Sequence, residues 1–199
     1  ARSIYVANHD VLSVNIDIRL QRNKQTILKH VLTADDERID FCMCNPPFYE
    51  SAAAYQKENA RKVRNLAANA RKRQPQTEGD GKEPKNARAS SSIGSNNFGG
   101  GPSELWYPGG EVAFIAKMME ESSCLAIDMP SKCLWFSSLV SRRDNLPKLI
   151  EILESNVVRR NKKVKDVRII QMGQGGLKTS QILFWSFHDV EEQRAWFRE

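Results

Sequence analysis

The residues of this chain best suited to chemistry are an amide and two prolines followed by an aromatic ring: Asn45, Pro46, Pro47 and Phe48. The Asn45 side-chain oxygen and the Pro46 carbonyl can accept both hydrogens of a planar –NH₂ group. The prolines make the loop rigid and remove competing N–H donors, and Phe48 or Tyr49 can stack on a flat ring beside the amine. Holding both hydrogens frees the nitrogen lone pair for attack by positioning rather than by a strong base. The motif therefore suits an exocyclic amine on an aromatic base, or a primary amide.

Other reaction types find little support in the sequence. The three histidines are scattered, and no Ser/His/Asp or Cys/His arrangement is recognisable. The four cysteines lack the spacing of a metal site, so we interpret them as core thiols in a reducing compartment and expect no metal. A simple turn that ends a strand is the alternative interpretation of the Asn-Pro-Pro-Phe segment.

Hydrophobic periodicity predicts the elements that position this motif. Residues 14–20 alternate as a strand does, 24–32 have helical spacing, and 38–44 form a second strand that ends at the prolines. Strand, helix and strand in this order predict a βαβ unit and parallel pairing. Ligands of such sheets bind beyond the carboxyl ends of the strands, which is where the motif lies.

Later parts of the sequence predict further helices and strands. They are helices over 52–66, 111–122 and 145–155, and strands over 133–140, 164–172 and 181–189. The short glycine-rich connection between the last two strands predicts an antiparallel hairpin. We therefore expect an α/β fold with a mainly parallel sheet that ends in a C-terminal antiparallel hairpin.

The positive charge of the chain is concentrated in one segment. The net charge is +6, and residues 57–88 hold ten Lys or Arg against four Asp or Glu, which accounts for the whole excess. Residues 67–97 are also of low complexity, so we expect a disordered basic insertion within the domain. We expect Arg71, Lys72 and Arg73 to contact RNA phosphates; a solvated linker is the alternative.

The remaining composition is that of an ordinary globular domain. Hydrophobic residues make up 40% and charged residues 27% of the chain. No apolar run approaches the roughly 20 residues needed to span a bilayer, and no signal peptide is recognisable. We expect a monomer inside the cell, in the cytoplasm or nucleus, with no membrane partner.

Four blocks of the sequence resemble a known family. They read DFCMCNPPFYESAA, NFGGGPSELWYPGGEVAFIAKMMEES, WFSSLVSRRDNLPKL and MGQGGLKTSQILFWSF. They are similar to the bacterial large-subunit ribosomal RNA adenine-N6 methyltransferases, which are class I enzymes with a Rossmann-like fold that use S-adenosyl-L-methionine. Eukaryotic relatives that methylate a small nuclear RNA and messenger RNA hairpins share these blocks. The resemblance covers most of the chain apart from about residues 67–95.

The resemblance implies roles for individual residues. Asn45 and Pro46 correspond to the residues that hold the adenine N6 amine, Pro47 completes the motif, and Phe48 corresponds to the stacking residue, assisted by Tyr49. The resemblance also implies that Asn45 and, by a looser match, Thr26 contact the cofactor. Lys178 falls in a block that can touch substrate. Gly109, Gly110 and Glu111 match a block interpreted either as shaping the pocket or as a helix-starting turn.

Class I domains begin with a glycine-rich cofactor loop and an acidic residue that binds ribose. Only 44 residues precede Asn45, and the glycine-rich runs of this chain follow it. We therefore expect a partial methyltransferase domain over residues 1–199 that lacks the first strands and the cofactor loop, and that is inactive in isolation.

The resemblance favours methyl transfer to an adenine of ribosomal RNA and leaves other functions open. The first alternative is a small nuclear RNA or messenger RNA hairpin as substrate. The others are a protein-glutamine or DNA-adenine methyltransferase, and a non-catalytic RNA-binding fragment.

Overall fold

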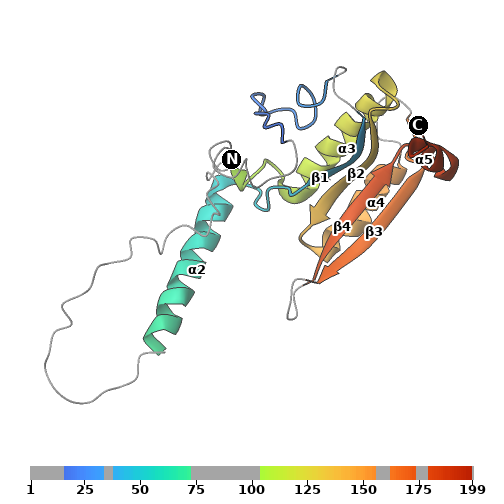
Figure 1. Cartoon of the computed structure of the whole chain (residues 1–199). Helices are drawn as coiled ribbons and strands as arrows, with labels where there is room; N and C mark the ends of the chain where they lie inside the picture. The colour runs from blue at the N-terminus through green and yellow to red at the C-terminus, as the bar shows by residue number, and fades with distance from the viewer. Residues whose placement is uncertain (1–15, 34–37, 73–103, 156–161, 174–178, 199) are drawn as a thin grey trace, which may run out of the picture.

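A computed structural model describes residues 16–33, 38–72, 104–155, 162–173 and 179–198 (Figure 1). The α-helices of these ranges are α2 (Ala52–Lys72), α3 (Gly110–Asp128), α4 (Leu146–Glu154) and α5 (Val190–Trp196). The strands are β1 (Ile39–Cys44), β2 (Cys133–Val140), β3 (Asp166–Gly173) and β4 (Thr179–Ser186), and η2 (Arg143–Asn145) is a short 3₁₀ helix. No helix in these ranges is long and apolar enough to cross a membrane.

The strands form one sheet in the order β1-β2-β4-β3. β1 pairs with β2 in parallel, with Cys44 opposite Ser138, while β4 is antiparallel to both β2 and β3. The α/β class and the C-terminal hairpin of β3 and β4 are confirmed. Parallel pairing places the carboxyl ends of β1 and β2 at the same end of the sheet.

One face of the sheet packs against α3 and α4 (Figure 1). Phe136 of β2 and Trp185 of β4 stack with ring centroids 6.0 Å apart and are both fully buried. The indole N–H of Trp185 donates to the hydroxyl of Ser122 on α3 at 2.9 Å, so this buried polar group is satisfied. These contacts fix where α3 lies, and therefore where α3 begins.

The opposite face carries exposed apolar side chains. Successive residues of a strand point to opposite faces, so Phe41 and Met43 of β1 share this face with Trp135 of β2. Phe41 is 59% and Met43 65% exposed, and β1 is an edge strand among the described residues. The Arg168 guanidinium lies 4.5 Å from the Trp135 ring centroid.

The first predicted strand and helix are wrong within the described residues. Residues 16–20 belong to no ladder, and 24–32 form turns rather than a helix. The carboxylate of Glu121 on α3 accepts the backbone N–H groups of Ile27, Leu28 and Lys29 at 2.7 to 3.2 Å. His30 then has φ of 67°, which a helix does not allow. A tertiary contact to α3 overrides the local helical spacing.

Other boundaries differ from prediction at the helix ends. α2 continues to Lys72, so residues 67–72 are helical, which corrects the start of the insertion expected over 67–97; residues 73–97 lie outside the described residues. α3 begins at Gly110 but continues to Asp128. α5 was not predicted, although Asp189 and Glu192 form the capping box that starts it.

Candidate active site

β1 delivers Asn45 to the carboxyl end of the sheet. The strand is held in register by the parallel ladder to β2 and by the Ser137 hydroxyl, which donates to the Cys42 carbonyl at 3.0 Å. Directly after the strand, the Asn45 side chain is exposed and has no hydrogen-bond partner among the described residues. Pro46 is buried and anchors the loop. The arrangement presents an amide on a rigid support, with its acceptor and donors available to a ligand.

The aromatic part of the motif is tied to the segment that precedes α3. The Tyr49 N–H donates to the Leu105 carbonyl at 3.1 Å, and the Tyr107 N–H donates to the Tyr49 carbonyl at 2.9 Å. The Tyr49 ring meets the Tyr55 ring edge-on at 5.4 Å. Phe48 remains 40% exposed, so its ring is accessible for stacking beside Asn45.

Two glycines form the turn that starts α3 beside this loop. Gly109 and Gly110 have φ of 81° and 69°, a backbone conformation that L side chains rarely adopt. A Cβ on Gly109 would lie 2.8 Å from the Ala113 Cβ, and one on Gly110 would lie 3.5 Å from the Glu50 Cβ. The glycines therefore serve as a helix-starting turn and also line the site, so the two interpretations of this block are compatible.

Glu111 connects the start of α3 to the end of β2. Its carboxylate is buried, with 4% exposure, and accepts the Ser141 N–H and the Asn145 side-chain amide, both at 2.6 Å. Both bonds are charge-assisted and short, so they are strong for protein hydrogen bonds. The loop between Ser141 and Asn145 is consequently fixed relative to α3.

These segments enclose a cavity of about 270 Å³ beside the motif. Phe48 and Tyr49 form one side, Gly109 and Gly110 lie at the start of α3, and Arg142 follows β2. Asn45 and Pro46 do not line it. The cavity therefore lies past Phe48 rather than at the amide itself.

The cysteine thiols next to the motif are not activated nucleophiles. Burial raises the pKa of Cys42, raises that of Cys44 to about 11 and raises that of Cys133 to about 12. All four cysteines are free, and those three stay protonated at neutral pH. The described residues also contain no group of His, Cys, Asp or Glu placed to hold a metal ion.

The structure does not bring every predicted site residue to Asn45. Thr26 contacts Asn23 in a turn, and the residues after it bind Glu121, which is about 16 Å along α3 from Gly110. Arg71 and Lys72 end α2, about 30 Å from its start, but their side chains are not described. Arg73 and Lys178 lie outside the described residues.

Arg142 was missed in the sequence analysis. It is exposed and lines the cavity, and no hydrogen bond or ion pair engages its guanidinium within the described part of the chain. A signal was available, because Arg142 comes two residues after the predicted strand 133–140. A parallel neighbour of β1 must end at the same edge of the sheet as Asn45.

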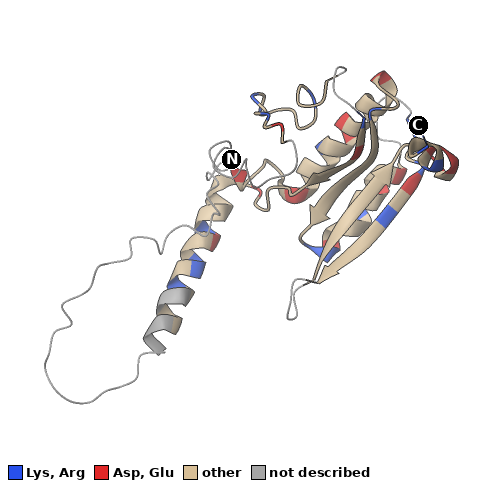
Figure 2. Cartoon of the chain, viewed as in Figure 1, with Lys and Arg blue, Asp and Glu red and all other residues tan. Residues whose placement is uncertain are grey.

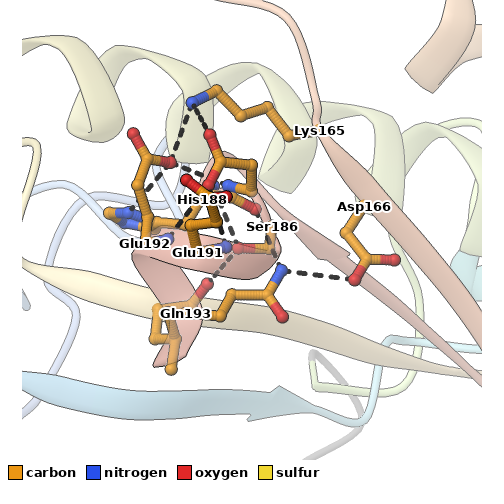
Figure 3. Close-up of polar contacts among 9 residues, drawn as sticks. Lys165, Asp166, Ser186, His188, Glu191, Glu192 and Gln193 are labelled. Atoms are coloured by element: carbon orange, nitrogen blue, oxygen red, sulfur yellow. Dashed lines mark hydrogen bonds and ion pairs between the residues drawn. The ribbon is translucent and has the colours of Figure 1, made fainter. Parts of the chain in front are cut away.

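The opposite end of the sheet holds a second polar cluster, which is internally paired. Lys165 donates to Asp189 at 3.0 Å and to Glu192 at 2.8 Å, and Gln193 donates to Asp166 at 3.2 Å (Figure 3). Lys165 is one of five Lys or Arg residues between 156 and 167 in the sequence. For Lys165 the structure shows ion pairs within the chain.

Fold and site together define an α/β protein of the methyltransferase class, and a family comparison agrees. A family model described as RNA methyltransferase matches residues 1–189. The chain belongs to this family, which confirms the resemblance of the four sequence blocks.

Individual relatives are named for ribosomal RNA. The chain is similar to ribosomal RNA large subunit methyltransferase F of Photobacterium profundum, with 40% identity over 196 residues covering 98% of this chain and 53% of the relative. The protein of the same name from Shewanella loihica is 35% identical over 191 residues, covering 96% of this chain and 42% of the relative. The chain thus spans about half the length of these relatives.

A solved structure supports the fold. The crystallised "delta-N METTL16 MTase domain" superposes with a TM-score of 0.51 and 21% identity, over 94% of this chain and 56% of that chain. At this identity the likeness concerns the fold alone.

Proposed function

We propose that this chain is the amine-holding part of an S-adenosylmethionine-dependent enzyme that methylates N6 of an adenine in large-subunit ribosomal RNA. The observation that carries the proposal is the exposed Asn45 amide, which has no partner among the described residues and precedes a buried proline at the carboxyl end of β1, beside the half-exposed Phe48. Family membership and the names of the relatives support RNA, and ribosomal RNA in particular, as the substrate.

Each residue of the motif has its own proposed role in holding the adenine. The N6 hydrogens are donated to Asn45 Oδ1 and to the Pro46 carbonyl, while Phe48 stacks on the ring. This geometry turns the nitrogen lone pair out of conjugation and toward the methyl donor. Phe48 also excludes water from one face of the ring, and the proton lost from N6 passes to solvent.

S-adenosylmethionine is proposed to bind next to the exposed Asn45 side chain and, when bound, would supply an electrophilic methyl group. The Asn45 side chain has spare hydrogen-bonding groups for it, and Thr26 remains a candidate contact on the adenine side. The rest of the cofactor site is proposed to come from polypeptide outside this chain, packed on the open edge of β1 where Phe41 and Met43 are exposed. The enzyme is proposed to act as a monomer where ribosomal RNA is made and assembled, in the cytoplasm or nucleus.

The basic helix that follows the motif is proposed to guide the RNA. α2 begins three residues after Tyr49 and extends away from the sheet, and its Lys and Arg residues outside the grey part lie near the middle of the helix (Figure 2). Arg61 is paired with Glu58, and Lys62 donates to the Tyr49 hydroxyl at 3.5 Å. Arg71, Lys72, Arg73 and, near the pocket, Lys178 are proposed as further RNA contacts.

The test is methyl transfer from labelled S-adenosylmethionine to ribosomal RNA, small nuclear RNA, DNA and protein. The enzyme is the protein that contains this chain, at the length of its relatives. Asn45→Ala should lower kcat by about 100-fold or more while RNA affinity stays within a factor of two. Asn45→Asp keeps an acceptor oxygen, so its kcat should fall less than that of Asn45→Ala. Unchanged transfer by Asn45→Ala, or transfer only to DNA or protein, contradicts the proposal.

A cofactor titration tests whether the cofactor site is divided between this chain and additional polypeptide. The 199-residue chain should bind S-adenosylmethionine more weakly than micromolar, and the longer protein should bind more tightly. Micromolar affinity of the 199 residues alone contradicts this division.

A further inference from the structure

The cavity past Phe48 has the features of a nucleotide pocket. Its aromatic side consists of Phe48 and Tyr49, and Gly109 and Gly110 line it at the start of α3. Its volume of about 270 Å³ is near the lower limit of small-ligand pockets, roughly 300 Å³, and suits one nucleotide rather than several.

Arg142 provides a cation on a fixed loop, and its guanidinium has no partner among the residues that the structure describes. It follows Ser141, whose N–H is held by Glu111, and it precedes Asn145, whose side chain is held by the same carboxylate. Its backbone is extended, with φ of −118° and ψ of 117°. The guanidinium therefore stands on a fixed loop and offers several N–H donors to an anion.

The charges around the cavity leave one place for a phosphate. The charge of Glu111 is engaged by its two donors, and Glu50, which also lines the cavity, is exposed and lies next to Gly110. Arg142 is the only cation among the described residues that line the cavity, so an anionic group is accommodated at Arg142.

We propose that this pocket receives the nucleotide adjacent to the target adenine, with its base against Phe48 and Tyr49 and its phosphate on Arg142. The inference rests on the proposed function, because it assumes an RNA adenine at Asn45. The target base itself cannot occupy the cavity, since Asn45 and Pro46 do not line it. The ring of Phe48 would separate the two nucleotides. Glu111 then acts as a positioning residue for Arg142.

The experiment compares two neighbouring arginines in the full-length protein. Arg142→Ala is expected to raise the KM for RNA about 10-fold while kcat changes less than twofold, because a phosphate contact serves binding rather than methyl transfer. The dependence of log affinity on log salt should weaken by about 0.7, the contribution of one phosphate. Arg143→Ala is the matched control, since Arg143 is exposed but does not line the cavity, and it should stay within twofold. Arg142→Lys should recover part of the loss.

A modified RNA identifies which group is bound. Neutral methylphosphonate linkages are placed on either side of the target adenine, one at a time. At one of the two positions wild-type affinity should fall about as far as it does in Arg142→Ala, and the two changes together should cost no more than either alone.

The outcomes separate this inference from the proposed function. If the wild type transfers no methyl group to RNA, the proposed function fails. If it does, but Arg142→Ala equals Arg143→Ala, or the losses from Arg142→Ala and the modified linkage simply multiply, the pocket assignment is wrong. Equal thermal melting of the two alanine variants excludes unfolding as the cause of a difference.

Discussion

The two ends of β1 use polar groups in opposite ways. At the amino end, the Trp196 indole donates to Asp40 at 2.8 Å, and the Arg38 guanidinium lies 4.7 Å from the Trp196 ring. At the carboxyl end, the side chains of Asn45 and Arg142 have no hydrogen-bond or ion-pair partner among the described residues. Side chains that pair within the chain stabilise the fold, whereas polar groups left unengaged on a rigid support are available to a ligand.

Both ends also show how a carboxylate can organise a helix start. Asp189 caps α5 through the N–H groups of Glu191 and Glu192, at 3.1 and 2.9 Å (Figure 3). Glu111 instead turns away from its own helix to hold Ser141 and Asn145. The first arrangement is local in sequence and the second links elements that are thirty residues apart, so only the second positions a site.

The largest expected effect on stability is at the amino end of β1. Trp196→Ala removes a buried ring and leaves Asp40 without its donor, so the free energy of unfolding should fall by about 3–5 kcal/mol. Denaturant unfolding measures this change. Trp196→Phe keeps the packing and should cost only about 1 kcal/mol. An equal loss in both variants would show that the hydrogen bond, not the ring, holds α5.

Removing the Glu111 carboxylate at the carboxyl end of β1 should have a smaller effect on stability and a measurable effect on RNA binding. Glu111→Ala leaves the Ser141 N–H and the Asn145 amide without acceptors, at a cost of about 1–3 kcal/mol in unfolding free energy. RNA affinity should fall as well, because Arg142 loses its fixed loop. Glu111→Gln keeps one acceptor oxygen and should fall between wild type and Glu111→Ala. If Glu111→Ala lowers stability but leaves the KM for RNA unchanged, Glu111 does not position Arg142.

Neutralising the basic residues at the end of α2 tests whether RNA binding extends from the carboxyl end of β1 to this segment. Changing Arg71, Lys72 and Arg73 together to Gln should weaken RNA binding by about 10-fold and lower its salt slope by about 2. Thermal melting serves as the control and should be the same for this variant and the wild type. Filter binding at several salt concentrations gives both quantities. An unchanged affinity and slope would mean that this segment is only a linker.

The smallest expected effect is a pH dependence of stability that comes from His188, near the amino end of β1. Burial lowers the pKa of His188 below its usual 6.5, partly opposed by Glu192, while Lys162 and Lys165 lower it further. The unfolded chain therefore takes up a proton near pH 6.5 before the folded protein does, so stability is full above that pH and declines as pH falls below it. His188→Gln should remove this slope. Thermal melts between pH 5 and 7 measure it, because the paired carboxylates of Asp166, Asp189 and Glu192 have lowered pKa values and do not titrate there.

Sequence reasoning succeeded where local signals and packing agree. The strand predicted over 133–140 has the same bounds as β2, and α4 contains the early proline that predicted its start. Both elements bury apolar residues on the face that periodicity indicates. The segment 24–32 failed for the opposite reason, because its backbone N–H groups bind Glu121, which is more than ninety residues away.

The sequence by itself determined the motif, its place after a strand and the family blocks, because a proline-locked loop and β periodicity are local properties of the chain. Only the tertiary structure decided that the start of α3 touches Glu50, that Glu111 holds the loop after β2, and that Arg142 stands beside Phe48. These contacts join residues distant along the chain. They depend on which strand lies next to β1 and on where α3 packs against the sheet.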